Sequence, residues 1–200
     1  MVVSKIQEYS SVIVDDYPFA QELKEEVMPI LDVLGRNDNA SLTSLYADSN
    51  MSQWGLDTTQ TERLKDYLMN LLKDHFPRWK GGRTDQYELR FKDFWANVYN
   101  KGDYHGLHNH TAYKLNQEDL YCYPPVYSIV YFLKSKWYHA PLVFKDSGKK
   151  ISPKEGRFIM FPAHMWHYVA EHKYKSQRIS LATNIEYYVR HTFFHLDEDP

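Results

Sequence analysis

Three histidines stand at a spacing that suits a metal ion. His108 and His110 form an H-x-H step, and His167 follows at the end of the segment FPAHMWH. On an extended strand, residues i and i+2 point to the same face, so the two imidazoles of the H-x-H step can converge on one ion. Neutral imidazole binds Fe, Zn, Cu and Ni alike. The pattern predicts a metal site of His108, His110 and His167, with incidental surface or core histidines as the alternative.

An arginine and a serine follow His167 in the segment 178–185. Strand alternation puts Arg178 and Ser180 on one face, together with Ala182 and Asn184, whereas the other face is apolar. An arginine on the inner face of a barrel strand needs an anionic partner. It binds a carboxylate through two parallel hydrogen bonds, and serine adds a hydroxyl. The pattern predicts a carboxylate-binding face, with an outward, solvated arginine as the alternative.

Asn97 and Tyr99 form another i, i+2 pair, on the segment that leads into His108. Standing alone, this pair would indicate ordinary core and edge packing. The pair draws attention only because its strand leads into the H-x-H segment.

Composition limits the class of protein. The chain has 200 residues, 43% hydrophobic and 25% charged, which is typical of one globular domain and excludes a disordered chain or a coiled coil. A net charge of -2 disfavours strong non-specific binding to nucleic acid. A single cysteine, Cys122, excludes an internal disulfide framework. With no long apolar run at the start or elsewhere, we expect no membrane partner and a cytoplasmic location.

The first part of the chain indicates helices. Apolar residues recur at helical spacing over 17–34, interrupted by Pro29, and again over 59–75, where Thr59 and Glu62 fit a capping box. The polar stretch 41–54 is typical of a loop. We therefore predict a mainly helical support region over 1–85.

The second part indicates short strands separated by Gly, Pro, Asn and Asp. This pattern predicts an α+β single-domain chain whose core, over 86–190, is a jelly roll or double-stranded β-helix, with the N-terminal helices packed on its outside. The expected strands are 87–91, 94–99, 127–133, 142–144, 157–161 and 178–185.

A long connection, 111–126, separates the H-x-H segment from the next strand. It carries Tyr113, Tyr121, Tyr123 and the Pro124-Pro125 pair. Loops of this length in compact domains are often functional lids, and a structural Ω-loop is an equally good interpretation.

These motifs together resemble the 2-oxoglutarate/Fe(II)-dependent oxygenases, over the span 95–184. The matching pieces are N-x-Y at Asn97, the H-x-H segment, the strand YSIVYFL, the segment GRFIMFP, the distal His167 and R-x-S at Arg178. The resemblance is to small oxygenases of bacteria and phages, and more distantly to prolyl hydroxylases.

The resemblance implies particular roles. The family holds Fe(II) by H-x-D/E and a distal histidine, so His108 and His167 would be ligands and His110 would stand where the carboxylate does. A three-histidine site, a water at that position, or a carboxylate from elsewhere such as Asp103 remain open, and we favour His110 as a ligand. A second departure is Phe132, where related sequences often have a tyrosine. The distal carboxylate of 2-oxoglutarate would bind Arg178, assisted by Ser180 or Tyr99. Asn97 and Asn184 are second-rank candidates for the same pocket.

The implied reaction consumes 2-oxoglutarate and O2, releases succinate and CO2, and hydroxylates a substrate C–H bond. The expected substrate is a peptidyl side chain such as proline, or a small molecule. The near-neutral charge disfavours nucleic acid, and the aromatic content leaves room for a homodimer interface. If the chain is encoded by a phage, its location would be the host cytoplasm.

Two other classes compete with this interpretation. The spacing of Gly102 and Gly156 to the histidines also resembles the two motifs of a cupin-type metal enzyme that does not use 2-oxoglutarate. A cupin would not need Arg178 and Ser180 inside its barrel. We therefore prefer the oxygenase interpretation. A non-enzymatic jelly-roll binding module with incidental histidines is the remaining alternative.

Overall fold

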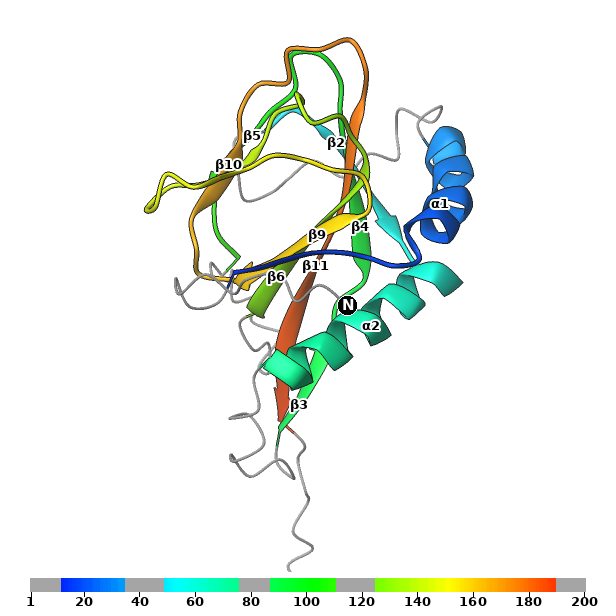
Figure 1. Ribbon diagram of the computed structural model, residues 1–200, viewed down its shortest axis with the longest axis vertical. Coiled ribbons are helices and arrows are strands. Elements are labelled where there is room, and N and C mark those ends of the chain that lie inside the picture. The colour runs from blue at the N-terminus through cyan, green and yellow to red at the C-terminus, as the bar shows by residue number, and fades with distance from the viewer. Residues whose placement is uncertain (1–11, 35–48, 76–86, 111–124, 190–200) are drawn as a thin grey trace, which may run out of the picture.

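The computed structural model describes residues 12–34, 49–75, 87–110 and 125–189. Two antiparallel sheets face each other, and two helices lie to one side of them (Figure 1). The expectation of a sheet-dominated jelly roll is confirmed. Of the long connection expected over 111–126, residues 111–124, with Cys122, lie outside the described residues, whereas 125 and 126 begin a strand.

The large sheet has seven strands in the order β1-β9-β6-β11-β4-β2, with β3 also paired to β11. Strand β11 is long enough to pair with β4 through its first half and with β3 through its second half. The strands are β1 (Ile13–Asp16), β2 (Ser52–Leu56), β3 (Tyr87–Phe91), β4 (Phe94–Tyr99), β6 (Pro125–Lys134), β9 (Arg157–Pro162) and β11 (Arg178–Val189).

The small sheet has four strands in the order β5-β10-β7-β8. They are β5 (His105–His108), β7 (Leu142–Phe144), β8 (Lys150–Ile151) and β10 (His167–Val169). The inner core lies between the two sheets, where Phe144 of the small sheet packs edge-on against Phe161 of the large sheet with ring centroids 5.1 Å apart. This apolar contact holds the two sheets face to face.

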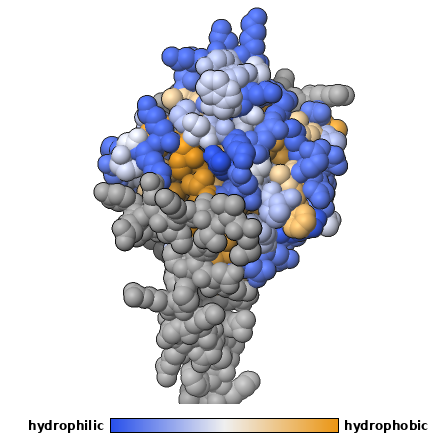
Figure 2. All heavy atoms as spheres, in the orientation of Figure 1, coloured by the Kyte–Doolittle hydropathy of each residue, from blue (hydrophilic) through white to orange (hydrophobic). Residues whose placement is uncertain are grey.

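A second core lies on the outer face of the large sheet. Leu23, Val27 and Leu31 of α1 (Ala20–Leu34) are buried there, as are Leu64, Leu68 and Leu72 of α2 (Thr59–His75). Each fully buried leucine contributes about 1.5–3 kcal/mol to folding. Among the described residues on the face shown in Figure 2, hydrophilic side chains predominate around a smaller apolar patch, because most apolar side chains lie in these two cores.

Helix α1 continues through Pro29, which we expected to interrupt it. Proline removes one backbone donor and leaves the carbonyl of Glu25 without its partner. Both residues are exposed, so water can bind that carbonyl. Burial of the apolar face of α1 keeps the helix intact across this position.

The cap of α2 also differs from the expectation. The side chain of Thr58, not Thr59, accepts a hydrogen bond from the backbone N–H of Thr61 at 3.2 Å. In return, the Thr61 hydroxyl accepts the N–H of Thr58 at 2.8 Å. This reciprocal pair of hydrogen bonds caps the N-terminus of α2. Glu62, which we expected in the capping box, forms an ion pair with Lys65.

The predicted strands are all present, and four others were missed: β1, β2, β8 and β10. The strand expected at the H-x-H step exists as β5 but ends at His108. The expectation of a loop over 41–54 is wrong from Ser52 onward, because that segment pairs with β4. These missed strands have five residues or fewer, and their alternation is too short to stand out in the sequence. Among the described residues, no helix combines the length and apolar content needed to span a membrane.

Gly156 lies just before β9, beside the segment that joins the edge strand β1 to α1. Its N–H donates to the carbonyl of Phe132 and its carbonyl accepts from Tyr17. Its φ is 80°, and a Cβ placed there would lie 2.9 Å from the Cβ of Ala20. A side chain at this position is therefore both strained and overpacked.

We predict that Gly156→Ala lowers the free energy of unfolding by about 2–4 kcal/mol, measured by urea denaturation. Gly148→Ala is the matched control, because Gly148 also has positive φ, at 64°, but has no heavy atom within 4 Å of the added Cβ. The control is expected to cost about 1 kcal/mol. Equal losses in the two variants would contradict the proposed clash with Ala20.

Candidate metal centre

His108, His110 and His167 converge at one point between the sheets. Each offers a ring nitrogen, and the three nitrogens lie within 4.8 Å of one another. The ring centroids of His108 and His167 are 4.2 Å apart, and the rings of His110 and His167 are parallel at 5.2 Å. No other group of three or more potential metal-binding side chains occurs among the described residues.

The backbone orients two of these rings. Nδ1 of His108 lies 2.8 Å from the carbonyl oxygen of Gly106, and Nδ1 of His167 lies 2.9 Å from that of Met165. A carbonyl can only accept, so each Nδ1 carries the proton and each Nε2 presents its lone pair. This is the arrangement that metal-binding histidines generally use.

His110 reaches the cluster by a different route from the one expected. Strand β5 ends at His108, so the H-x-H step does not lie on a continuous strand. The backbone N–H of His110 donates to the carbonyl of Ala163 at 2.9 Å, which anchors the residue to the turn before β10. Contact with the β9–β10 turn, rather than strand alternation, therefore places the third imidazole.

Burial keeps the three imidazoles neutral. It lowers the pKa of His110 to about 3, with the neighbouring histidines adding to the effect. The pKa of His108 is lowered and that of His167 is held well below its usual value, chiefly by burial. Neutral imidazoles keep a free lone pair, so a divalent cation that accepts nitrogen ligands fits this donor set.

The cluster opens onto a cavity of about 350 Å³, including its opening to solvent. Its wall on the large sheet consists of three cross-strand pairs of β4 and β11, and its wall on the small sheet comes from β5, β7 and β10. The paired residues are Trp95 with Ala182, Asn97 with Ser180 and Tyr99 with Arg178. Val130, His105, Leu142 and Val169 complete the lining.

Arg178 is fully buried, and its guanidinium has no hydrogen-bond partner among the described residues. The guanidinium carbon lies 4.5 Å from the ring centre of Tyr99 and 5.3 Å from that of Phe132. Burial lowers the pKa of Arg178, and Tyr99 opposes that effect. An unpaired buried cation is costly, so the donors of Arg178 are suited to an anion that enters the cavity.

The other predicted residues fall into two groups. Asn97, Tyr99 and Ser180 line the cavity, and the side-chain oxygen of Asn97 accepts a hydrogen bond from Gln53 at 2.7 Å. Asn184 lies beyond the lining and accepts a hydrogen bond from Ser128 at 2.8 Å. Asp103 accepts the backbone N–H of Asn100 in a turn and is not part of the histidine cluster.

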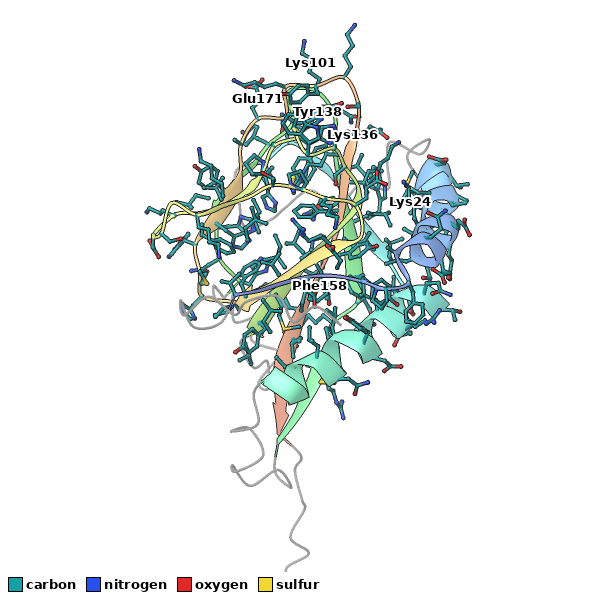
Figure 3. The ribbon with its side chains drawn as sticks, in the orientation of Figure 1. Lys24, Lys101, Lys136, Tyr138, Phe158 and Glu171 are labelled. Carbon is teal, nitrogen blue, oxygen red and sulfur yellow. The ribbon has the colours of Figure 1, made fainter. Side chains whose placement is uncertain are left out.

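A network of buried side chains fixes the start of β11. Nε2 of His172 lies 2.7 Å from the carbonyl oxygen of Ser176, and Nε2 of His139 lies 2.9 Å from its hydroxyl. Lys101, Lys136, Tyr138 and Glu171 lie on the same loop end of the molecule (Figure 3). The network holds the turn just before Arg178, and it is a structural use of histidines outside the cluster.

Sequence reasoning missed two lining residues. Trp95 lies at i−2 from Asn97, so alternation along β4 could have identified it; its ring centre is 6.3 Å from that of His110. His105 stands three residues before His108, and simple alternation puts it on the opposite face. Only the pairing of β5 with β10 reveals that it lines the cavity.

The comparisons with known proteins agree with this geometry. Residues 93–184 match the sequence model of a family described as "Putative 2OG-Fe(II) oxygenase". This span contains all three clustered histidines and Arg178. No curated protein sequence matches the chain.

Solved structures with the same fold cover most of the chain. A prolyl-4-hydroxylase from Pseudomonas putida has a TM-score of 0.61 and 17% identity, over 88% of this chain and 92% of that one. The viral collagen prolyl hydroxylase vCPH from Paramecium Bursaria Chlorella virus-1, in its 2OG complex, has a TM-score of 0.60 and 14% identity, over 90% and 98%.

A third similar structure is HygX from Streptomyces hygroscopicus, with nickel and 2-oxoglutarate bound. Its TM-score is 0.58 with 13% identity, over 88% of this chain and 82% of that one. At these identities the structures establish a shared fold, and the family match covers the site-bearing strands. The site-bearing part of the chain is therefore similar in sequence to the 2-oxoglutarate/Fe(II) oxygenases, and the chain shares the fold of these solved structures.

Proposed function

We propose that this chain is a hydroxylase that binds Fe(II) through His108, His110 and His167 and 2-oxoglutarate through Arg178. The observation that carries the proposal is the fully buried, unpaired guanidinium of Arg178 in the same cavity as the histidine cluster. The cavity thus offers one site for a divalent cation and one for a carboxylate, on facing sheets. A dicarboxylate that also binds metal matches both.

The metal would be held by the Nε2 atoms of His108 and His167 and by a ring nitrogen of His110. When bound, Fe(II) with 2-oxoglutarate would supply the electrons that activate O2 for hydroxylation. The protein residues orient the ligands and keep bulk water out. Backbone carbonyls of Gly106 and Met165 hold the two oriented rings in the tautomer that this task needs.

Arg178 would bind the distal carboxylate of 2-oxoglutarate through its guanidinium. Ser180 adds a hydroxyl on the same face of β11, and Tyr99 packs its ring on the arginine. Asn97 lies across from Ser180 and is oriented by Gln53. Asn184 would act only indirectly, by holding Ser128 beside the cavity wall.

His110 replaces the carboxylate that the family pattern expects. All three proposed ligands are therefore neutral, and they compensate less of the charge on Fe(II) than a set with one carboxylate would. The contact of His110 with the turn at Ala163 supports its role as a ligand, because that contact directs the residue into the cluster.

The reaction we propose is hydroxylation of a C–H bond, with release of succinate and CO2. The similar structures leave two substrate classes open, since two are prolyl hydroxylases and one HygX structure is described with hygromycin B bound. We propose a peptidyl side chain or a small molecule. The core would be the double-stranded β-helix of 86–190, supported by 1–85; a homodimer and a cytoplasmic location stay predictions.

The direct test separates the two halves of the site. Anaerobic protein is loaded with Fe(II), titrated with 2-oxoglutarate, and followed by the visible metal-to-ligand charge-transfer band. We predict that His167→Ala abolishes metal binding, whereas Arg178→Ala keeps the metal and weakens 2-oxoglutarate binding by about tenfold to a hundredfold.

His110→Asp tests the departure from the family pattern, and it is expected to retain or strengthen Fe(II) binding. Fe(II) binding without a band in the unmodified protein would favour a cupin-type enzyme. Absence of metal binding would favour a non-enzymatic binding module.

The buried charge of Arg178 predicts a gain of stability when it is removed. We expect Arg178→Met, without ligands, to keep or raise the free energy of unfolding, by up to about 3 kcal/mol, because an unpaired buried cation is replaced by an apolar side chain. Thermal unfolding measures this. The buried neighbour Tyr99 offers the control, since Tyr99→Ala removes packing and should destabilise by about 3 kcal/mol. A loss above about 2 kcal/mol in Arg178→Met would show that the arginine is already paired.

The buried histidines predict how the metal-free protein responds to pH. Burial lowers the pKa of His105 to about 2 and that of His110 to about 3, whereas histidine in the unfolded chain titrates near 6.5. The unfolded chain therefore binds more protons between these values, and stability falls as pH falls below 6.5. Each of the two histidines should lower the free energy of unfolding by about 1–2 kcal/mol between pH 7 and pH 5, measured by urea denaturation. A midpoint that does not change over this interval would contradict the neutral, buried state of these rings.

A further inference from the structure

His105 is a fourth imidazole in the cavity, and the role of the histidine cluster does not account for it. It is 9% exposed and lines the cavity. Its ring is nearly parallel to that of His108, at 16°, with centroids 3.9 Å apart.

A β-bulge brings His105 to this face. His167 pairs with His108 and Val169 pairs with His105, so the one residue between them on β10 lies opposite two residues of β5. Without the extra residue, positions three apart on a strand would face opposite sides of the sheet. Bulges of this kind often redirect a side chain beside an active site. The small sheet thus departs from regular pairing at the point that turns His105 inward.

His105 does not lie where it could bind the ion proposed at the histidine cluster. Its ring nitrogens are not part of the group that lies within 4.8 Å. A ring stacked face-to-face on His108 lies beside the direction of the His108 Nε2 lone pair, not along it. It is therefore suited to contact a molecule bound next to the metal, and not the metal itself.

The order of residues along the cavity puts His105 between the two proposed binding points. His110 lies near Trp95 at one end of the β4–β11 ladder, and Arg178 pairs with Tyr99 at the other end. Strand β5 runs away from the His110 end, so His105 lies on the Arg178 side of His108. Consistently, His105 is within electrostatic range of His108, His167 and Arg178.

We propose that His105 is a cosubstrate-binding residue that donates a ring N–H hydrogen bond to the keto-acid end of 2-oxoglutarate, while Arg178 binds its distal carboxylate. This inference rests on the proposed function. A neutral imidazole has one N–H donor, and a carboxylate or keto oxygen beside the metal would accept it. A purely packing role would require only a flat ring on His108, which phenylalanine could supply.

The test uses the whole chain loaded with Fe(II) without oxygen, and two probes: 2-oxoglutarate, and pyruvate, which has the keto-acid end but no distal carboxylate. The visible charge-transfer band gives both the affinity and the band position. We expect His105→Phe to weaken both probes by about tenfold to a hundredfold and to shift the band, with Fe(II) affinity unchanged. Arg178→Ala should weaken 2-oxoglutarate and leave pyruvate unaffected.

Two further variants keep the test specific. His105→Gln retains an N–H donor and should weaken the probes less than His105→Phe does. Leu107→Ala changes an exposed residue of the same strand and should leave both probes unaffected. Unchanged probe affinity and band position in His105→Phe would overturn the inference. Loss of Fe(II) binding in that variant would also overturn it. So would a weakening of the probes in His105→Gln or Leu107→Ala that equals the weakening in His105→Phe. If the unmodified protein gave no band with 2-oxoglutarate, the proposed function itself would fail.

Discussion

The buried guanidinium of Arg178 is the constraint on which the rest of the site depends. It has no hydrogen-bond partner among the described residues and sits between the rings of Tyr99 and Phe132. Those rings offset only part of the cost of removing a cation from water. The fold tolerates this cost because β11 lies in the interior of the large sheet, paired on both sides. Such an unsatisfied group is expected where a ligand is to be bound.

The positions of the clustered histidines depend on the pairing of the short strands in the small sheet. β10 has only three residues, yet it pairs with β5 on one side and β7 on the other. This pairing fixes His167 opposite His108, and backbone carbonyls set the tautomer of each ring. The proposed cation and anion sites therefore lie on opposite sheets, and the apolar packing between the sheets sets their separation.

The sequence predicts the long, strongly patterned elements and fails at the short ones. The bounds of helix α2 were predicted correctly, because four leucines and one tyrosine recur at helical spacing. Its cap, however, is Thr58, one residue earlier than predicted. β2 and β10 could not be predicted, since they exist through pairing with strands distant in sequence. The convergence of His108 and His110 was expected from strand alternation, whereas the structure achieves it by the contact of His110 with Ala163. His105 was passed over because a bulge, which depends on β10, decides its direction.

An anaerobic crystal structure with iron and 2-oxoglutarate would test the central claim most directly. Anomalous scattering from iron locates the ion independently of its ligands. The account predicts one iron between His108, His110 and His167, and one 2-oxoglutarate whose distal carboxylate forms two hydrogen bonds with Arg178. Iron at another site, or 2-oxoglutarate that leaves Arg178 unpaired, would contradict it.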